Sequence, residues 1–149
     1  MSKTKERALE MLNRRDYSRA ALIDKLVEKG EDPMEAEAAV DYLVSLGFVD
    51  DARFAPIIVR HYAAKGYGRR RVLEELRRHK IAKEFWDEAM EQMPEQDDAL
   101  DRFLKTKLRS AQPDRAELKK AADAALRRGY SWDEVRSALA RYNATIEDN

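Results

Sequence analysis

Apolar side chains recur along this chain at intervals of three or four residues, with charged side chains between them. One such stripe consists of Ala36, Val40, Leu43 and Val44, a spacing that places the four side chains on one face of an α-helix. Extended runs of Val, Ile and Thr that alternate with polar residues, which are typical of half-buried strands, do not occur. The pattern predicts an all-α fold.

The stripes and the residues between them predict about nine helices. Ser18, Asp32 and Ser131 are predicted N-caps, and Gly30, Gly47, Gly66 and Gly129 are predicted to end helices, because glycine readily adopts the left-handed conformation that follows a helix. The predicted helices cover residues 4–13, 19–29, 33–46, 51–65, 69–79, 83–93, 97–109, 114–128 and 132–142.

Short motifs recur at intervals of about 50 residues. Tyr17-Ser-Arg and Tyr67-Gly-Arg are 50 residues apart, and Lys29-Gly30, His79-Lys80 and Arg128-Gly129 follow one another at 50 and 49 residues. We therefore expect three tandem three-helix repeats, at residues 1–50, 51–95 and 96–143, and a flexible tail at residues 144–149. Units this small normally stack on their neighbours, so we expect an elongated, curved array.

The composition limits the classes of function. The chain of 149 residues is 39% charged but has a net charge of zero, and it has no cysteine. Disulfides and thiolate metal sites are thereby excluded. Sequence-independent DNA binding relies on neutralising phosphates, so direct DNA binding is expected to be weak and salt-sensitive.

The chain shows neither a transmembrane segment nor a signal peptide, which indicates a cytoplasmic protein without membrane contact. A heptad seam is also missing, which favours a monomer.

Positive charge is concentrated in the middle of the chain. Residues 60–80 contain eight Lys or Arg against two acids, Glu74 and Glu75. A local field of this sign attracts polyanions or acidic protein surfaces even when the whole molecule is neutral.

Four stretches carry further information: SRAALIDKLVEKG, DDARFA at residues 50–55, KGYGRRRV at 65–72 followed by EELRRHKI, and RRGYSWDEVRSAL at 127–139. With these stretches in this order, the sequence resembles the RecX family, whose members regulate the bacterial recombinase RecA. The combination of DD-x-RFA with KGYG-x-RR is specific to the family. One departure is His79-Lys80-Ile81, where the family usually has Lys-Gly-Ile. Without glycine, a left-handed turn there costs about 1 kcal/mol more, or the turn takes another shape.

The resemblance implies tandem three-helix repeats and a role in homologous recombination and DNA repair. It implies a negative regulator that binds the RecA filament on single-stranded DNA and limits its ATPase, strand-exchange and coprotease activities. The residues themselves leave two alternatives open: a DNA-binding module of helix–turn–helix type, or a general helical adaptor between proteins. The acidic or mixed sequences DPMEAEAAVDYL and SWDEVRSAL would face phosphate poorly, which argues against the first alternative.

The candidate contact residues are mostly cations of the central stretch. Arg69, Arg70 and Arg71 lie in the first turn of a predicted helix, where the helix dipole disfavours cations, so this placement suggests that they contact phosphate or carboxylate. The alternative is a solvated face offset by Glu74 and Glu75. The remaining candidates are Arg77, Arg78, Lys80, Arg53 and Tyr67.

Each of these remaining candidates also has a structural interpretation. The dipole alone explains Arg77, Arg78 and Lys80 near a helix C-terminus. Arg53 contacts either a partner or the acids Asp50 and Asp51. Tyr67 either stacks on a base or packs between repeats.

The sequence offers no catalytic constellation. Asp50 and Asp51 are explained by helix capping better than by metal binding, and His61 and His79 lack partners at ligand spacing. We therefore expect no enzymatic activity, no cofactor and no metal.

Overall fold

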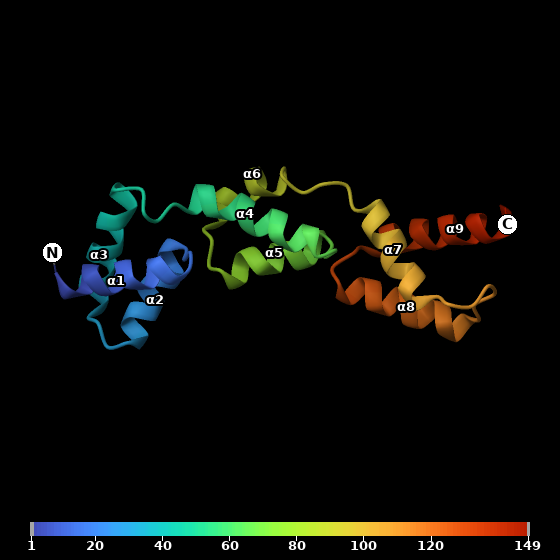
Figure 1. Cartoon of the computed structure of the whole chain (residues 1–149), viewed down its shortest axis with the longest axis horizontal. Helices are drawn as coiled ribbons and strands as arrows, with labels where there is room; N and C mark the ends of the chain where they lie inside the picture. The colour runs from blue at the N-terminus through green and yellow to red at the C-terminus, as the bar shows by residue number, and fades with distance from the viewer. Residues whose placement is uncertain (1, 149) are drawn as a thin grey trace. The chain divides into compact units, whose positions relative to one another are not determined.

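A computed structural model describes residues 2–148, with side chains described for residues 2–143 (Figure 1). In this part of the chain the secondary structure consists of nine α-helices and one 3₁₀ turn, without a strand. The all-α prediction is therefore confirmed. The elements are α1 (Lys3–Arg14), α2 (Arg19–Glu28), α3 (Pro33–Ser45), α4 (Asp51–Ala64), α5 (Arg69–Arg78), η1 (Lys83–Phe85), α6 (Trp86–Met90), α7 (Asp97–Lys107), α8 (Arg115–Arg127) and α9 (Trp132–Asp148).

The predicted N-caps form as the sequence indicates. The side chain of Ser18 accepts a hydrogen bond from the amide of Ala21, and the side chain of Asp32 accepts from the amides of Met34 and Glu35. Ser131 and Glu134 form a reciprocal capping box, with hydrogen bonds of 2.8 and 3.1 Å. These contacts span three residues or fewer, so local sequence determines them.

Two segments differ from the predicted helices. The segment 83–93 forms the 3₁₀ turn η1 and the short helix α6, and the amides of Glu91 and Gln92 then bond to carbonyls three residues back, which tightens the end of the helix. Pro94 follows closely and disfavours helical geometry at Met93. At the C-terminus, α9 is helical to Asp148, whereas the sequence predicts a flexible tail at residues 144–149. The predicted tail ends at residue 149, which lies outside the described residues.

The contacts divide the chain into two compact units, Met1–Ile58 with Glu75–Gln92 (unit 1) and Val59–Glu74 with Met93–Asn149 (unit 2). In unit 1 the helices α1, α2 and α3 pack against one another, and in unit 2 the helices α7, α8 and α9 do the same. Three-helix packing is therefore confirmed for the first and third repeats. Two helices of the middle repeat, α4 and α5, each contribute to both units, and its third helix, α6, lies in unit 1.

Each unit has its own hydrophobic core. The core of unit 1 contains buried residues of α1, α2 and α3, among them Leu22, Leu26, Val40 and Leu43. The core of unit 2 contains Leu100, Leu104 and Leu108, alanines of α8, and the buried Tyr130. The alanines allow the α8 backbone to approach its neighbours closely, and Tyr130 carries a polar hydroxyl into this core.

Candidate partner-binding site

The predicted contact residues lie in two groups, one in each unit. The first group is in unit 2 and consists of Tyr67, Arg69, Arg70 and Arg71. The second group is in unit 1 and consists of Arg53, Arg77, Arg78 and Lys80.

The first group surrounds the N-terminus of α5, which lacks a capping side chain because Gly68 precedes the helix. Backbone carbonyls at the end of α8 take the role of the cap. The amide of Gly68 donates to the carbonyl of Arg128 at 2.8 Å, and the amide of Arg70 donates to the carbonyl of Gly129 at 3.1 Å. We call this contact between the C-terminus of α8 and the N-terminus of α5 the α5–α8 joint.

The α5–α8 joint explains how cations are tolerated at a helix N-terminus. The carbonyl end of α8 carries the negative pole of its helix dipole, which favours nearby cations. The guanidinium of Arg70 donates directly to the carbonyl of Leu126 in this end. The dipole of α8 thus offsets the unfavourable dipole of α5.

Only glycine fits at the two positions where the backbones of the α5–α8 joint approach each other most closely. A Cβ atom on Gly68 would lie 2.5 Å from the backbone C of Gly129, and a Cβ atom on Gly129 would lie 2.5 Å from the amide N of Arg71. Gly129 also has φ = +101°, a conformation that side-chain-bearing residues rarely adopt. The approach of the two backbones therefore depends on both glycines.

Arg128 connects the α5–α8 joint to the rings of Tyr67 and Phe103. Its guanidinium donates to the carbonyl of Lys65 at 2.6 Å, and its Cζ lies 4.6 Å from the ring centroid of Tyr67 and 4.9 Å from that of Phe103. The Cζ of Arg71 also lies 4.6 Å from the Tyr67 centroid. Two cations of the protein therefore already contact the half-buried Tyr67, which favours packing over base stacking for this residue.

Tyr130 lies in the core of unit 2 and holds the turn between α4 and α5 in place. Its hydroxyl donates to the carbonyl of Gly66 at 2.7 Å. Burial raises the pKa of Tyr130 above its ordinary value of 10.0, so the phenol stays protonated and available as a donor.

Arg69 differs from its two neighbours. Its side chain is exposed and makes no hydrogen bond or ion pair with any residue that the structure describes. Arg70 and Arg71 both contact the protein around the joint. Three arginines that are adjacent in sequence therefore differ in their contacts within the protein.

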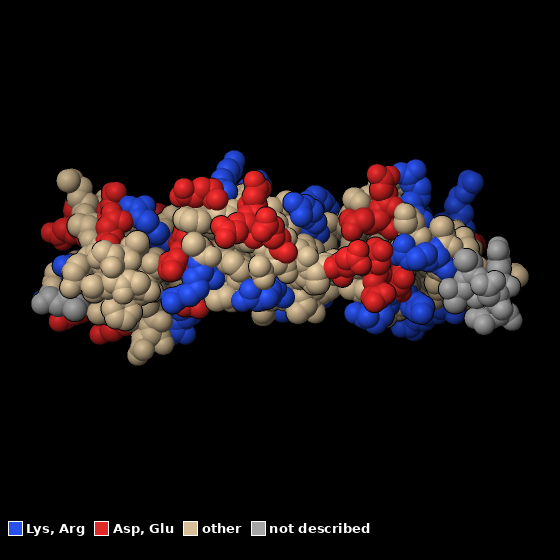
Figure 2. Space-filling view, turned by 90° about the horizontal axis from the view of Figure 1, so that it is seen from above, with Lys and Arg blue, Asp and Glu red and all other residues tan. Residues whose placement is uncertain are grey.

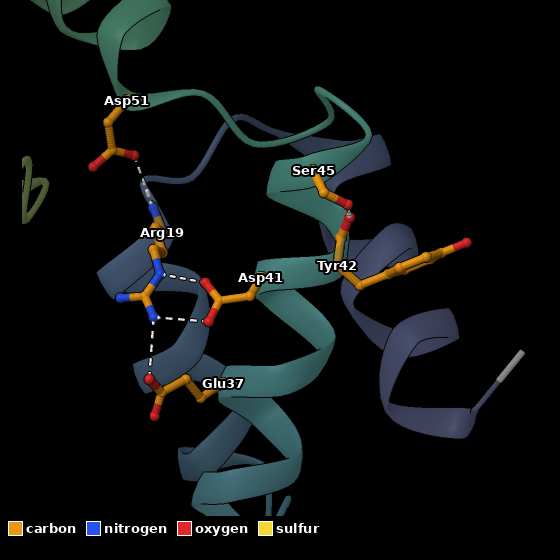
Figure 3. Close-up of polar contacts among 6 residues, drawn as sticks. All are labelled: Arg19, Glu37, Asp41, Tyr42, Ser45 and Asp51. Atoms are coloured by element: carbon orange, nitrogen blue, oxygen red, sulfur yellow. Dashed lines mark hydrogen bonds and ion pairs between the residues drawn. The ribbon is translucent and has the colours of Figure 1, made fainter.

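Arg19 occupies the position in the first repeat that Arg69 occupies in the second, and it shows what this position can bind (Figure 3). Its Nε donates to Oδ1 of Asp41 at 2.7 Å and its Nη2 to Oδ2 at 3.2 Å, while Glu37 accepts from Nη2 at 3.3 Å. The hydrogen bond to Asp41 raises the pKa of Arg19 and lowers the pKa of Asp41. An arginine at the start of this helix can therefore bind two carboxylates at once, one of them in a bidentate manner through Nε and Nη2.

The second group of predicted residues is mostly engaged within unit 1. Lys80 forms an ion pair with Asp24, and Arg78 forms one with the buried Glu75 at 3.4 Å. Arg77 has its Cζ 5.8 Å from the ring of Trp86. Lys80 also adopts φ = +58°, the left-handed turn that the sequence analysis considered for the missing glycine.

The acids near Arg53 have capping roles. Asp50 accepts from the amide of Arg53 at 3.2 Å, which confirms that capping accounts for one of the two acids. Asp51 accepts instead from the amide of Arg19 at 2.9 Å and so caps α2 (Figure 3). The guanidinium of Arg53 is exposed and makes no ion pair with the described part of the chain.

The remaining surface features are a cleft and a mixed pattern of charges. A cleft of about 580 Å³ in unit 2 is lined by both cations and acids, including Lys65, Arg102, Glu95 and Asp98. Acidic and basic side chains lie beside one another on the face seen in Figure 2. Among the described residues, no group of three His, Asp or Glu could hold a metal ion, and no helix is long and apolar enough to cross a membrane.

Sequence reasoning missed Arg128, Gly129 and Tyr130 as part of this site. They were visible within the RRGY motif, but their role depends on contacts with residues more than 50 positions away. The 49-residue offset between His79-Lys80 and Arg128-Gly129 was the signal that could have indicated a shared structural role.

Comparison with known proteins gives consistent matches. The sequence models of the RecX first and second three-helix domains match residues 5–43 and 50–90. The regulatory protein RecX of Vibrio campbellii is 33% identical over 139 residues, covering 92% of this chain and 90% of the relative. The regulatory protein RecX of Stenotrophomonas maltophilia is 39% identical over 140 residues, covering 93% and 85%. The crystal structure of RecX from Lactobacillus salivarius superposes with a TM-score of 0.84 at 18% identity, covering 95% of this chain and 96% of that structure, which shows the shared fold.

Proposed function

The chain belongs to the RecX family, and from this premise we propose that it is a non-catalytic negative regulator of the RecA recombinase in the cytoplasm. The protein would bind the RecA filament on single-stranded DNA and limit its ATPase, strand-exchange and coprotease activities. The observation that carries the proposal is the cluster of Arg69, Arg70 and Arg71 at the N-terminus of α5, where backbone hydrogen bonds join this helix to the end of α8. The chain around this cluster resembles RecX proteins over most of its length.

The structure changes the mutational test of this cluster. From sequence, replacing all three arginines with alanine would be expected to reduce inhibition and leave stability nearly unchanged. Because Arg70 and Arg71 contact the α5–α8 joint, the triple variant is expected to lose stability as well. The function is therefore better tested first with the unmodified protein.

The test is the ATPase rate of RecA from the same organism, assembled on single-stranded DNA and titrated with this protein. A fall in the rate at sub-stoichiometric amounts supports a filament regulator. An unchanged rate with the folded protein would contradict the proposal and leave the fold assignment intact.

Direct DNA binding is the rival function. Binding to a bare oligonucleotide at two salt concentrations separates the two, because affinity that comes from phosphate contacts falls steeply as salt rises. The zero net charge of the chain leads us to expect weak binding in this experiment.

A further inference from the structure

Two arginines of this chain hold the same position in successive repeats and have different surroundings. Arg19 and Arg69 are 50 residues apart, and each is the first residue of the second helix of its repeat. Arg19 is paired with the carboxylates of Asp41 and Glu37. Arg69 is exposed and has no partner among the residues described.

From this difference we propose that Arg69 contacts an acidic patch on the RecA protein itself and that Arg128 is the positioning residue for this contact. The inference rests on the proposed function and names the residues and the chemistry of its contact. A carboxylate is favoured over a phosphate because the equivalent Arg19 binds two carboxylates, one of them in a bidentate manner through Nε and Nη2.

Arg128 acts on Arg69 through the turn that precedes it. It donates from Nη2 to the carbonyl of Lys65 at 2.6 Å and from Nε to the carbonyl of Gly66 at 3.4 Å, and it stacks on Tyr67. Its own carbonyl accepts from the amide of Gly68 at 2.8 Å. The side chain of Arg128 therefore binds the carbonyls of this turn, and its backbone carbonyl binds an amide of the turn. The turn comprises residues 65–68 and directly precedes Arg69.

The remaining arginines of the cluster support the same arrangement. Arg70 donates to the carbonyl of Leu126, and Arg71 stacks on Tyr67. The contact of Arg70 ties the first turn of α5 to the end of α8, and the contact of Arg71 ties it to the preceding turn. Arg69 is the member of the triplet left to reach a partner.

The first arm of the test compares Arg69→Ala with Arg19→Ala, which removes the same side chain from the same repeat position. Both are titrated into RecA on single-stranded DNA, and the concentration for half-maximal ATPase inhibition is measured. We expect this concentration to rise at least tenfold for Arg69→Ala and less than twofold for Arg19→Ala. The melting temperature should fall only for Arg19→Ala.

The second arm tests Arg128 as a positioning residue. Arg128→Ala is measured alone and combined with Arg69→Ala, at a temperature where circular dichroism shows each variant folded. We expect Arg128→Ala to weaken inhibition at least fivefold alone and to add less than twofold in the Arg69→Ala background. Where Arg128→Ala does not fold, Tyr130→Phe, which removes only the hydrogen bond to the carbonyl of Gly66, replaces it with the same expectation of non-additivity.

The outcomes separate this inference from the proposed function. If the unmodified protein inhibits and Arg69→Ala inhibits equally well, the contact assignment is overturned and the function stands. Full additivity of the two substitutions would remove the positioning role of Arg128. If Arg69→Ala instead loses affinity for a bare oligonucleotide with a reduced salt dependence, the partner group is phosphate and the carboxylate assignment is wrong. A protein that does not inhibit RecA at all ends both proposals.

Discussion

The hydroxyl of Ser18 donates a hydrogen bond to the carbonyl of His79 at 2.5 Å. It links the start of α2 to the end of α5 across 61 residues, and Ser18 is fully buried. The amide of Gly68 and the carbonyl of Arg128 form the corresponding link in unit 2, from the start of α5 to the end of α8. The same contact between the second helices of successive repeats thus occurs once in each unit, through a side chain in one case and through backbone alone in the other.

Replacing Ser18 with alanine should lower the free energy of unfolding by about 2 kcal/mol, because it removes both an N-cap and a long-range hydrogen bond. Chemical denaturation measures the change. Ser131→Ala is the matched control, since Ser131 caps a helix at an exposed position and makes only local hydrogen bonds; it should lose about 1 kcal/mol. Equal losses for the two variants would show that the contact with His79 adds no stability.

Replacing Gly129 with alanine should destabilise the protein by more than about 3 kcal/mol, since the methyl group would collide with the backbone of Arg71 and force the α5–α8 joint apart. Gly47→Ala is the control, because Gly47 also has positive φ, of +82°, but no atom lies within 4 Å of its Cβ position. It should lose only about 1 kcal/mol from backbone strain. The comparison by thermal melting therefore separates steric conflict from strain, and similar losses would contradict the close approach of the two backbones.

Replacing Lys80 with glycine should stabilise the protein by about 0.5–1 kcal/mol, because glycine adopts φ near +58° without strain. The substitution also removes the ion pair with Asp24. Both partners of this pair are about half exposed, so the loss is expected to be small. Asp24→Asn, which breaks the pair and leaves the turn unchanged, measures this loss separately. A lower melting temperature for Lys80→Gly would show that the ion pair outweighs the strain.

The pair of Arg19 and Asp41 should make stability depend on pH in the acid range. The pKa of Asp41 is lowered in the folded state by its hydrogen bond to Arg19. The folded protein therefore binds the proton less readily than the unfolded chain does. The stabilisation is present above the ordinary aspartate pKa of about 3.9 and is lost as pH falls through the lower pKa of the folded state.

Melting curves of the unmodified protein and of Asp41→Asn between pH 7 and pH 2.5 test this linkage. The variant should be less stable at pH 7 by no more than about 1 kcal/mol, because the pair is exposed to solvent. The difference should disappear toward pH 2.5. A constant difference across the range would mean that Asp41 acts through packing and not through its charge.

Much of this protein follows from local sequence. The caps at Ser18, Asp32 and Ser131 formed as predicted, because each needs only residues within one helical turn. The spacing of apolar residues placed the helices, and the 50-residue period predicted the three-helix packing found in the first and third repeats. The segment 83–93 formed a shorter helix because its end tightens into 3₁₀ geometry ahead of a proline.

The tertiary structure decided which of the equivalent residues remain available. Arg69, Arg70 and Arg71 are identical and adjacent. In the folded protein Arg70 binds the end of α8, 56 residues away, and Arg71 contacts the ring of Tyr67, while Arg69 stays exposed. Asp51 caps a helix that begins 32 residues earlier, and Arg128 supports a turn more than 60 residues away. Sequence by itself determined the helices, because their hydrogen bonds and caps are local. Packing decided the contacts between repeats, because these depend on how closely two backbones approach, which no stretch of sequence specifies alone.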